Sequence, residues 1–452
     1  MKLWRGLRCE FEAPPWVIGI VGAGGKSTLL HRLAQEAAAA GYRVVATTTT
    51  RWWIDQWRRF GRPLLASSLE TAQGLVHTLL PGEVLSLARV KDESTGKVVG
   101  LPAEWIEALL PHGDVILVEA DGARGKPLKA PAPFEPVLPH VCSHVILVAG
   151  WHGIGKPLNA SWVHRPQHFA RVSGLALEAP VTVSALVRVL THPQGGLQHL
   201  PPHSRVVVVI NQIDDEHALH KAREAVPALL ACDRVDEVLL ASLQAADPLW
   251  EVHGRVGVVV LAAGAGTRFG GPKQVTPWRG RPLIMHVLDA VAQVDVDEVV
   301  VVLGAYASRV EAVLARWHEG HPHVPLRVVV NPRWQEGQST SVRVGVEALS
   351  RVSAALFLPA DQPLISGALL ATLMATHRKT LAPAVVPRYG GQPGAPVLFD
   401  RRLFPELTTL RGDVGGRGVW QTRRSQVAWV DWPEPAVARD VDTPEDLAAL
   451  DA

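Results

Sequence analysis

Two glycine-rich turns, each directly after an apolar run, limit what this chain can fold into. The segment Val17–Leu30 reads VIGIVGAGGKSTLL, and Val256–Lys273 reads VGVVVLAAGAGTRFGGPK. Each pattern predicts a buried strand, a loop of the size that holds a phosphate, and then a helix, which is how an α/β unit begins. The two turns therefore predict an α/β protein with two such units.

Seven further apolar runs have the near-continuous Val, Ile and Leu character of strands in a parallel sheet covered on both faces. They are Val44–Thr48, Val115–Glu119, Val145–Ala149, Val206–Ile210, Val299–Leu303, Val328–Val330 and Ala355–Pro359. A helical pattern over Thr28–Ala40 ends before Gly41. The length of 452 residues suits two large domains or three of ordinary size. A polar stretch near residue 253 predicts a boundary between domains 1–252 and 253–452.

Composition excludes several classes of protein. Hydrophobic residues make up 47% of the chain, which is enough for packed cores and argues against disorder. Lys and Arg number 45 against 43 Asp and Glu, so no strong field would attract nucleic acid or a membrane surface. We also expect no signal peptide and no membrane span, because no long apolar run is present. Three scattered cysteines predict no disulfide framework and favour a reducing, cytoplasmic location.

The first glycine loop, Gly22–Thr28, has the residue types of a phosphate-binding loop. Glycines let backbone amides approach phosphates, a lysine reaches the outer phosphates, and a hydroxyl can bind Mg²⁺. The residues expected to bind nucleotide are Gly22, Gly24, Gly25, Lys26, Ser27 and Thr28. Ile20 stands where the usual Walker spacing requires a glycine, so the loop is shorter and resembles that of Mur-type ligases. The alternative is a plain glycine turn, which Lys26 and its two hydroxyl neighbours disfavour.

Two later strand ends support a nucleotide site for ATP or GTP. A buried strand runs into Glu119 and Asp121, where a carboxylate could lie near Mg²⁺ as on a Walker B strand. The segment Asn211-Gln212-Ile213-Asp214 resembles the N-K-x-D base-reading motif of GTPases, with Gln212 in place of lysine. An Asp at position 214 can accept hydrogen bonds from guanine, but the lysine-to-glutamine difference leaves the base open. Solvated strand-end turns are the alternative for both segments.

Together these segments resemble the selenium-dependent molybdenum hydroxylase accessory proteins, the YqeC-like family. The resemblance rests on GAGGKST, the run Thr47–Thr50, EADGARGKPLKAPAPFEPVLP, His164–Pro166 and NQID. It implies a nucleotide-binding accessory domain of the P-loop type with a parallel sheet. Arg51 stands where the family usually has a lysine, and His152 stands where an aspartate is expected.

Three other groups of residues resemble functional sites but are better explained by packing or by exposure to solvent. Trp53, Trp57 and Phe60 have helical spacing, which predicts a packed helix face rather than a nucleic-acid platform. His140, Cys142 and His144 share one face of a potential strand but lack further zinc ligands. Arg124, Lys126 and Lys129 could hold an anionic substrate, although a solvated loop is the default interpretation.

The second glycine loop, Leu261–Lys273, has a more specific pattern. Its backbone amides would wrap a triphosphate, and Arg268 and Lys273 would neutralise the charge of departing pyrophosphate. We expect nucleotide contacts from Leu261, Ala262, Ala263, Gly264 and Gly266, with catalytic roles for Arg268 and Lys273. The string resembles nucleotidyltransferases that activate a phosphorylated acceptor.

Three downstream segments narrow this resemblance to molybdenum cofactor cytidylyltransferases, the MocA-like family with a Rossmann-like, GT-A-like fold. They are Asn331–Ser341, which includes Ser339 and Ser341 as expected nucleotide contacts, Phe357–Leu364, which includes Asp361, and Asp440–Asp446. The resemblance implies transfer of CMP from CTP to Mo-molybdopterin, with release of pyrophosphate. The start Leu261-Ala262-Ala263-Gly264 favours the cytidine branch. Ala395 stands where a histidine often precedes Pro396.

Asp361 and Asp442 are the expected Mg²⁺ ligands, with Asp361 also catalytic, because Mg²⁺ commonly takes one or two carboxylates plus phosphates and water. Asp442 also reads as a helix cap, and Asp440 is the other candidate ligand. A guanylyltransferase remains an alternative, as does a non-catalytic chaperone that loads cofactor into a molybdenum hydroxylase. The expected partners are small molecules and an apo-hydroxylase.

Overall fold

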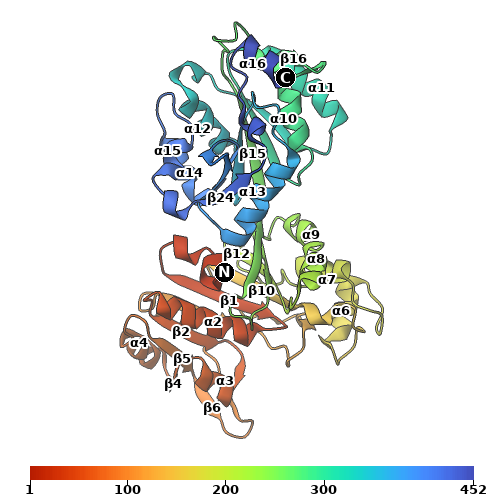
Figure 1. The fold of residues 1–452 in the computed structure, drawn as a ribbon. Coiled ribbons are helices and arrows are strands. Elements are labelled where there is room, and N and C mark those ends of the chain that lie inside the picture. Colours follow the sequence, from red (N-terminus) through yellow and green to blue (C-terminus); the bar gives the residue numbers. More distant parts are fainter. Residues whose placement is uncertain (452) are drawn as a thin grey trace. The chain divides into compact units, whose positions relative to one another are not determined.

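The computed structural model describes residues 1–451, and Ala452, the last residue of the predicted second domain, lies outside the described residues. The chain forms two compact units, Met1–His253 and Gly254–Ala452 (Figure 1). Each unit is a mixed α/β structure built on a large sheet. None of the helices in the described part is both long and apolar enough to cross a membrane.

The first unit is built on a nine-stranded sheet whose centre is the strand before the first glycine loop. Its order is β14 (Leu249–Gly254), β13 (Glu237–Ala241), β12 (Arg205–Asn211), β10 (His144–Gly150), β1 (Trp16–Gly22), β8 (Val115–Glu119), β2 (Val44–Thr48), β5 (Val84–Ala88) and β4 (Arg62–Leu65). The pairs from β13 through β4 are parallel. Because parallel strands all end at the same edge, the loops after β1, β8, β10, β12 and β13 meet there.

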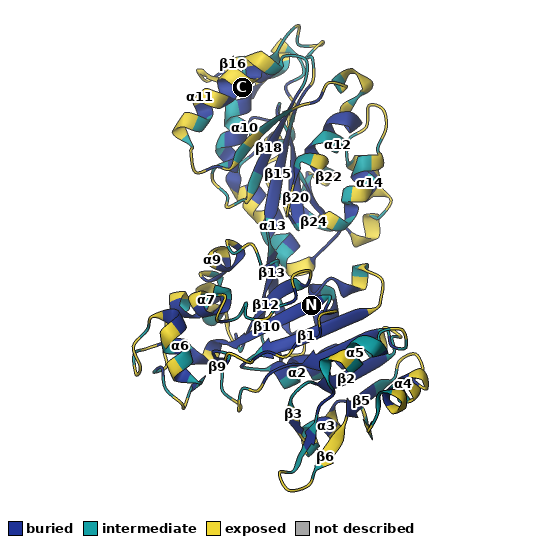
Figure 2. Ribbon diagram, turned by 180° about the vertical axis from the view of Figure 1, so that it is seen from behind, coloured by how far each residue is buried: buried dark blue, intermediate teal, exposed yellow. Residues whose placement is uncertain are grey.

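Helices and small ribbons complete the first unit. The helices are α1 (Leu3–Gly6), α2 (Lys26–Ala39), α3 (Ile54–Arg59), α4 (Leu69–His77), α5 (Ala103–Leu109), α6 (Pro166–Ser173), α7 (Val183–Thr191), α8 (Glu216–Arg223) and α9 (Val226–Leu230). The short strands are β3 (Arg51–Trp53), β6 (Val90–Asp92), β7 (Lys97–Val99), β9 (Leu128–Lys129) and β11 (Val163–His164). The central strands are buried along their length, as Figure 2 shows, which confirms the predicted apolar runs.

The second unit has a mixed sheet rather than a fully parallel one. Its order is β19 (Leu326–Val330), β18 (Glu298–Leu303), β15 (Val256–Ala262), β20 (Ala354–Pro359), β23 (Val397–Asp400), β21 (Ala384–Tyr389) and β22 (Gln392–Pro393), with β24 (Ala428–Trp432) paired to β21. The four strands from β19 to β20 are parallel, whereas β23 is antiparallel to both neighbours. The predicted buried run Val328–Val330 lies in the edge strand β19, which is only partly buried.

Helices cover both faces of this second sheet. They are α10 (Leu283–Val291), α11 (Ala307–Gly320), α12 (Gln338–Ala348), α13 (Gly367–Thr380), α14 (Phe404–Thr409), α15 (Arg417–Gln421) and α16 (Pro444–Ala448), with a small ribbon of β16 (Pro277–Trp278) and β17 (Arg281–Pro282). Val258 and Val260 of β15 belong to one apolar core and Val259 to another. The alternation follows from the two-residue period of a strand, and it fixes β15 between two packed layers.

Two predicted side-chain patterns are wrong in detail. Trp53 lies in β3 and is 59% exposed, whereas Trp57 and Phe60 are buried, so the three do not form one packed helix face. Trp52 takes the inward position because neighbouring strand residues point to opposite faces. His140 and Cys142 precede β10, which begins at His144, so they do not share a strand face with it.

Candidate functional site

The first glycine loop joins β1 to α2 at the carboxyl edge of the first sheet. Gly24 and Gly25 have φ values of 81° and 138°, which side chains rarely adopt. A Cβ at Gly24 would lie 2.4 Å from the backbone N of Gly150, and one at Gly25 would lie 2.3 Å from Asn211 Nδ2. Both positions therefore require glycine. Ser27 and Thr28 follow on the first turn of α2 and are half-buried.

Lys26 is enclosed by the loop and by Asp121. Its Nζ donates to the carbonyl of Gly22 at 2.8 Å and pairs with Asp121 Oδ1 at 2.9 Å. The backbone N–H of Gly22 donates to Asp121 Oδ2 at 3.0 Å, so the carboxylate also holds the loop. Burial lowers the pKa of Lys26, but the carboxylates of Asp121 and Glu119 more than offset this, and the pKa is raised overall. Lys26 is therefore a charged ammonium at neutral pH.

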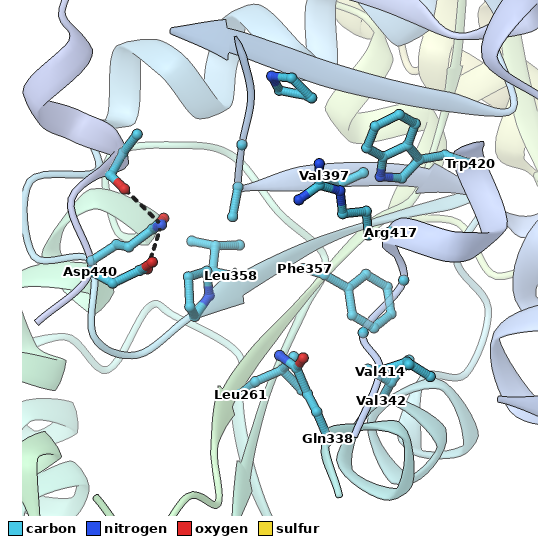
Figure 3. Close-up of a pocket in the computed structure, with 18 of the residues that line it drawn as sticks. Leu261, Gln338, Val342, Phe357, Leu358, Val397, Val414, Arg417, Trp420 and Asp440 are labelled. Atoms are coloured by element: carbon cyan, nitrogen blue, oxygen red, sulfur yellow. Dashed lines mark hydrogen bonds between the residues drawn. The ribbon is translucent and has the colours of Figure 1, made fainter. Parts of the chain in front are cut away.

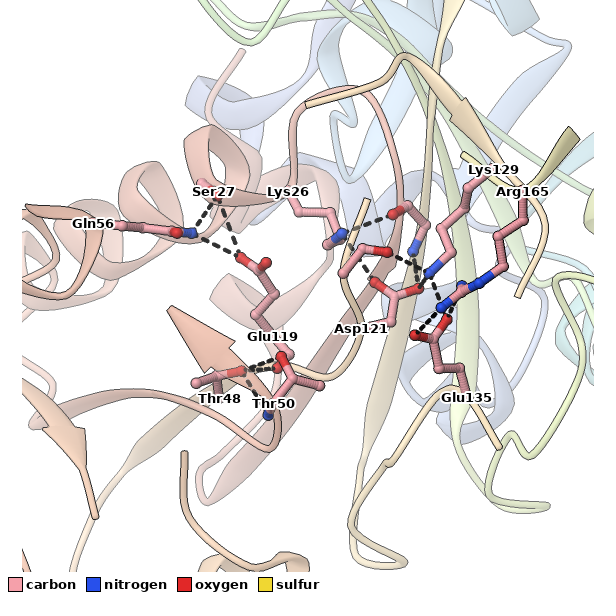
Figure 4. Close-up of polar contacts among 12 residues, drawn as sticks. Lys26, Ser27, Thr48, Thr50, Gln56, Glu119, Asp121, Lys129, Glu135 and Arg165 are labelled. Carbon is pink, nitrogen blue, oxygen red and sulfur yellow. Dashed lines mark hydrogen bonds and ion pairs between the residues drawn. The ribbon is translucent and has the colours of Figure 1, made fainter. Parts of the chain in front are cut away.

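A chain of alternating charges extends from Lys26 (Figure 4). Lys129 Nζ lies 2.8 Å from Asp121 Oδ2 and 2.9 Å from Glu135 Oε2, and Arg165 donates to both Glu135 oxygens at 2.6 and 2.9 Å. Burial raises the pKa of Glu135, but Arg165 and Lys129 lower it more strongly, to about 2. The default interpretation of Lys129 as a solvated loop residue is wrong, because only 8% of it is exposed.

Glu119 faces the hydroxyl of Ser27 at the end of β8. Its Oε2 accepts from Ser27 Oγ at 3.3 Å, and Gln56 Nε2 lies 2.6 Å from Ser27 Oγ and 3.4 Å from Glu119 Oε2. Burial raises the pKa of Glu119, with a further rise from Asp121 and an opposing effect of Lys26. A hydroxyl and a carboxylate are hard oxygen ligands, so this pair suits Mg²⁺. Sequence reasoning missed Gln56, which has no motif of its own.

Asn211 and Asp214 lie beside the first glycine loop. Asn211 Nδ2 donates to the carbonyl of Gly24 at 2.7 Å, and Asn211 Oδ1 accepts the backbone N–H of Leu243 at 2.8 Å. Asp214 Oδ1 accepts from Ser242 Oγ at 3.1 Å, and its Oδ2 lies 2.7 Å from His152 Nε2. The structure thus brings Asn211 to the loop, whereas the side-chain contacts of Asp214 are with Ser242 and His152.

The second glycine loop borders a cavity of about 590 Å³. Residues expected from the sequence form much of its wall: Leu261, Ala263, Gly264, Gly266, Arg268, Lys273, Ser341, Asp361 and Asp442. Gln274 Nε2 donates to the carbonyls of Ala262 and Gly264 at 3.1 and 2.8 Å, which fixes the start of the loop. The cavity volume is in the range of small-molecule sites.

Two cations and two carboxylates meet at this cavity. Lys273 Nζ contacts Asp361 Oδ2 and lies 3.1 Å from Asp442 Oδ1, while Arg268 lies 2.9 Å from Asp442 Oδ2. Burial lowers the pKa of Lys273, but Asp361 and Asp442 raise it more, so the ammonium stays protonated. The helix-cap interpretation of Asp442 is wrong, because Thr443 is the N-cap of α16 in a capping box with Asp446. Asp442 is therefore left to face the two cations.

A third carboxylate, Asp440, is held slightly apart. Gln362 Nε2 donates to it at 2.8 Å, and burial, with the nearby charge of Asp361, raises its pKa. Asp361 and Asp442 present oxygen atoms to one ammonium, and the donor set fits Mg²⁺, which prefers such ligands. Among residues 1–451, no group of three or more His, Cys, Asp or Glu side chains is arranged to hold a metal by itself. Any Mg²⁺ here would need substrate oxygens as further ligands.

The two predicted serines occupy different environments on α12. Ser341 lines the cavity, and its Oγ accepts from Asn331 Nδ2 at 3.0 Å. Ser339 is fully buried, and its N–H donates to the carbonyl of Gly412 at 3.3 Å. The Oγ of Ser339 has no hydrogen-bond partner within the described part of the chain.

A second cavity has a volume of about 920 Å³, and Figure 3 shows the residues that line it. The two share Leu261, Gln338, Pro359 and Asp413 as lining residues. Its wall combines apolar rings, such as Phe357 and Trp420, with the polar groups of Gln338, Gln362, Arg417 and Asp440. Sequence reasoning gave no role to Gln338, Asp413 or Trp420, although Gln338 and Asp413 lie within the family-like segments Asn331–Ser341 and Gly412–Arg417.

The two folds and the two glycine loops define a protein that joins two α/β units, each with a loop after a central parallel strand and a lysine–aspartate pair at that loop. A family model described as YqeC protein matches residues 18–167, and one described as MobA-like NTP transferase domain matches residues 258–427. The chain is 37% identical over 235 residues to the uncharacterized protein YqeC of Escherichia coli strain K12, covering 51% of this chain and 88% of that protein.

Two further relatives match the second unit. Nicotine blue oxidoreductase of Paenarthrobacter nicotinovorans is 33% identical over 204 residues, covering 42% of this chain and 94% of that protein. The crystal structure of Rv0371c from Mycobacterium tuberculosis H37Rv is 30% identical and covers 43% of this chain and 96% of that one, with a TM-score of 0.36. The chain belongs to the YqeC family through its first unit and to the MobA-like NTP transferases through its second.

Proposed function

We propose that the second unit transfers CMP from CTP to Mo-molybdopterin, giving molybdopterin cytosine dinucleotide and pyrophosphate. The observation that carries this proposal is the cluster of Lys273, Arg268, Asp361 and Asp442 on the wall of a cavity bordered by the second glycine loop. Phosphoryl chemistry depends mainly on positioning and charge neutralisation, and this cluster offers both.

The loop amides, Lys273 and Arg268 would bind the triphosphate of CTP. Asp361 and Asp442 would hold Mg²⁺, which when bound supplies further positive charge to the phosphates. An oxygen of the acceptor's terminal phosphate forms a bond to the α-phosphorus of CTP, and the bond to pyrophosphate breaks. Lys273 stays protonated, because its pKa is raised, and so neutralises the leaving group.

The second cavity is the proposed acceptor site. It adjoins the nucleotide cavity through Leu261 and Gln338, so a bound acceptor could reach the α-phosphorus. The rings of Phe357 and Trp420 would contact a flat pterin, and Arg417 offers positive charge to its phosphate.

The first unit is proposed to be a nucleotide-binding accessory module that uses ATP or GTP, with the domains divided as 1–252 and 253–452. The enclosed Lys26, Ser27 and Glu119 support a Mg²⁺–nucleotide site there. The molybdenum hydroxylase served by the cofactor is the proposed protein partner.

The test is nucleotide competition with Mo-molybdopterin and Mg²⁺. We expect CMP transfer from CTP, with equal amounts of pyrophosphate, well ahead of GMP transfer from GTP, because of the Leu261-Ala262-Ala263-Gly264 start. Equal or better use of GTP would replace the cytidine assignment with the guanylyl alternative. Binding without pyrophosphate release would favour the cofactor-loading chaperone instead.

A further inference from the structure

Three segments far apart in sequence meet beside the first glycine loop. In the sheet order, β12 and β13 lie on one side of β1, beyond β10. The residues that follow these strands, Asn211–Asp214 and Ser242–Leu243, therefore reach the same edge as the loop. On the other side of β1, β8 brings Glu119 and Asp121. A nucleotide whose phosphates lie on the loop would extend its base toward one of these two sides.

Asn211 fixes the geometry on the β12 side. Its side-chain amide donates to Gly24 and accepts from Leu243, so it joins the loop to the segment after β13. Only 5% of Asn211 is exposed, so its side-chain amide is a buried link between the two segments. The position of Asp214, three residues further on, is thereby set relative to the phosphate loop.

Asp214 presents a carboxylate to solvent in a fixed orientation. Its side chain is 58% exposed, although Ser242 Oγ donates to Oδ1 and His152 Nε2 lies 2.7 Å from Oδ2. A carboxylate has about four lone-pair positions, so Oδ1 can accept a second donor while Ser242 stays in place. A ligand donor that replaces His152 would complete a pair of parallel hydrogen bonds.

Guanine is the base that offers such a pair. Its N1–H and its exocyclic N2–H₂ are adjacent donors on one edge, whereas adenine presents there an N1 lone pair and a C2–H. A carboxylate accepts two hydrogen bonds from guanine but faces a lone pair of adenine. We propose that the first unit binds guanine nucleotides and that Asp214 reads the base, which deepens the proposed nucleotide-binding role of the first glycine loop.

The experiment measures GDP and ADP binding to the full chain by calorimetry in the presence of Mg²⁺. Lys26→Ala identifies the binding that belongs to the first loop, with folding checked by thermal melting. Two hydrogen bonds to a charged group predict a preference for GDP over ADP of roughly tenfold to hundredfold. If Lys26-dependent binding occurs but ADP binds as well as GDP, the base assignment is wrong while the nucleotide-binding role stands. If neither diphosphate shows Lys26-dependent binding, both are wrong.

Asp214→Asn gives a gain-of-function readout. An amide at this position donates where the carboxylate accepted, so it should weaken GDP binding by a similar factor and improve binding of XDP, whose C2 bears a carbonyl. Asp215→Asn is the matched control, because Asp215 caps α8 through the N–H of Ala218 and asparagine caps about as well. Unchanged GDP affinity in a folded Asp214→Asn variant would overturn the proposal.

Discussion

The two glycine loops have the same arrangement of strand, loop, lysine and aspartate. They differ in how far the lysine and the aspartate are buried. In each unit the loop strand pairs with a parallel neighbour, and an aspartate two residues beyond that neighbour's end binds the loop lysine. The backbone hydrogen bonds at the two strand ends are also alike. The N–H of Ala120 donates to the carbonyl of Ile20 at 3.1 Å, and the N–H of Ala360 donates to the carbonyl of Leu261 at 3.2 Å. Yet the side chains of Lys26 and Asp121 are 5% and 2% exposed, whereas those of Lys273 and Asp361 are 13% and 21% exposed.

Loop length explains the difference. Lys26 begins α2 and folds back onto the carbonyl of Gly22, so the first loop closes around its own lysine. The longer second loop runs from Ala263 to Pro272 before Lys273 and leaves a cavity of about 590 Å³. We infer that the enclosed Lys26–Asp121 pair contributes more to the stability of its unit than the more open Lys273–Asp361 pair does.

The largest expected effect is on the stability of the enclosed site. Asp121→Asn should lower the free energy of unfolding of the first unit by about 3–5 kcal/mol, because buried Lys26 would lose its ion-pair partner and Lys129 would keep only Glu135. Asp361→Asn should change the stability of the second unit by about 1 kcal/mol or less, since solvent reaches that pair and repulsion with Asp440 is relieved. Urea unfolding measures both; equal losses would contradict the contrast in enclosure.

The next effect concerns catalysis at the open site. Asp361→Asn and Asp442→Asn should each slow CMP transfer by about 10²–10³, because each removes a catalytic electrostatic contact. Rates against Mg²⁺ concentration check this, with Asp431→Asn as the control, since Asp431 forms an exposed pair with Arg388. A normal rate and normal Mg²⁺ dependence in folded Asp442→Asn would shift the ligand role to Asp440.

The smallest expected effect is the acid dependence of the enclosed site. Glu135 has its pKa lowered from 4.5 to about 2, so its contribution to stability is complete above pH 4.5 and is lost as the pH falls toward 2. Such a shift corresponds to roughly 3 kcal/mol at most. Glu135→Gln should therefore destabilise the first unit at pH 7 and have little effect near pH 2. Calorimetric melting across this pH range measures it, and a pH-independent difference would contradict the assignment.

The sequence predicted the fold well where local pattern determines structure. The runs Val44–Thr48 and Val115–Glu119 match β2 and β8 at both ends, because continuous β-branched and apolar residues suit buried parallel strands. The antiparallel β23 was not predicted, since the partner of a strand depends on distant chain segments. The same limit applies to the exposed Trp53, which satisfied a helical spacing but lies in a strand.

At the two candidate sites, residue type and local pattern predicted which residues to consider. The sequence did not predict which side chains would contact one another. A lysine after glycines and an aspartate after an apolar strand predicted Lys26, Asp121, Lys273 and Asp361 as site residues, and the structure pairs each lysine with an aspartate. Lys129 looked like a surface residue because its partners Asp121 and Glu135 come together only when the loop between β8 and β10 folds back. His152 and Asp214 are likewise joined by the sheet and not by proximity in sequence.

The hydrogen bonds of the Asn211 side chain also have a consequence for protein synthesis, because they join the first glycine loop to segments that are translated much later. The first glycine loop is made before Asn211, which braces it, and before Leu243, to which Asn211 is hydrogen-bonded. Ribosomes add about 5–20 residues per second, so this bracing becomes available only roughly 10–40 seconds after the loop itself has been translated. Until then, the nascent loop lacks its support. The proposed nucleotide site of this unit is therefore complete only after nearly all of the unit has left the ribosome.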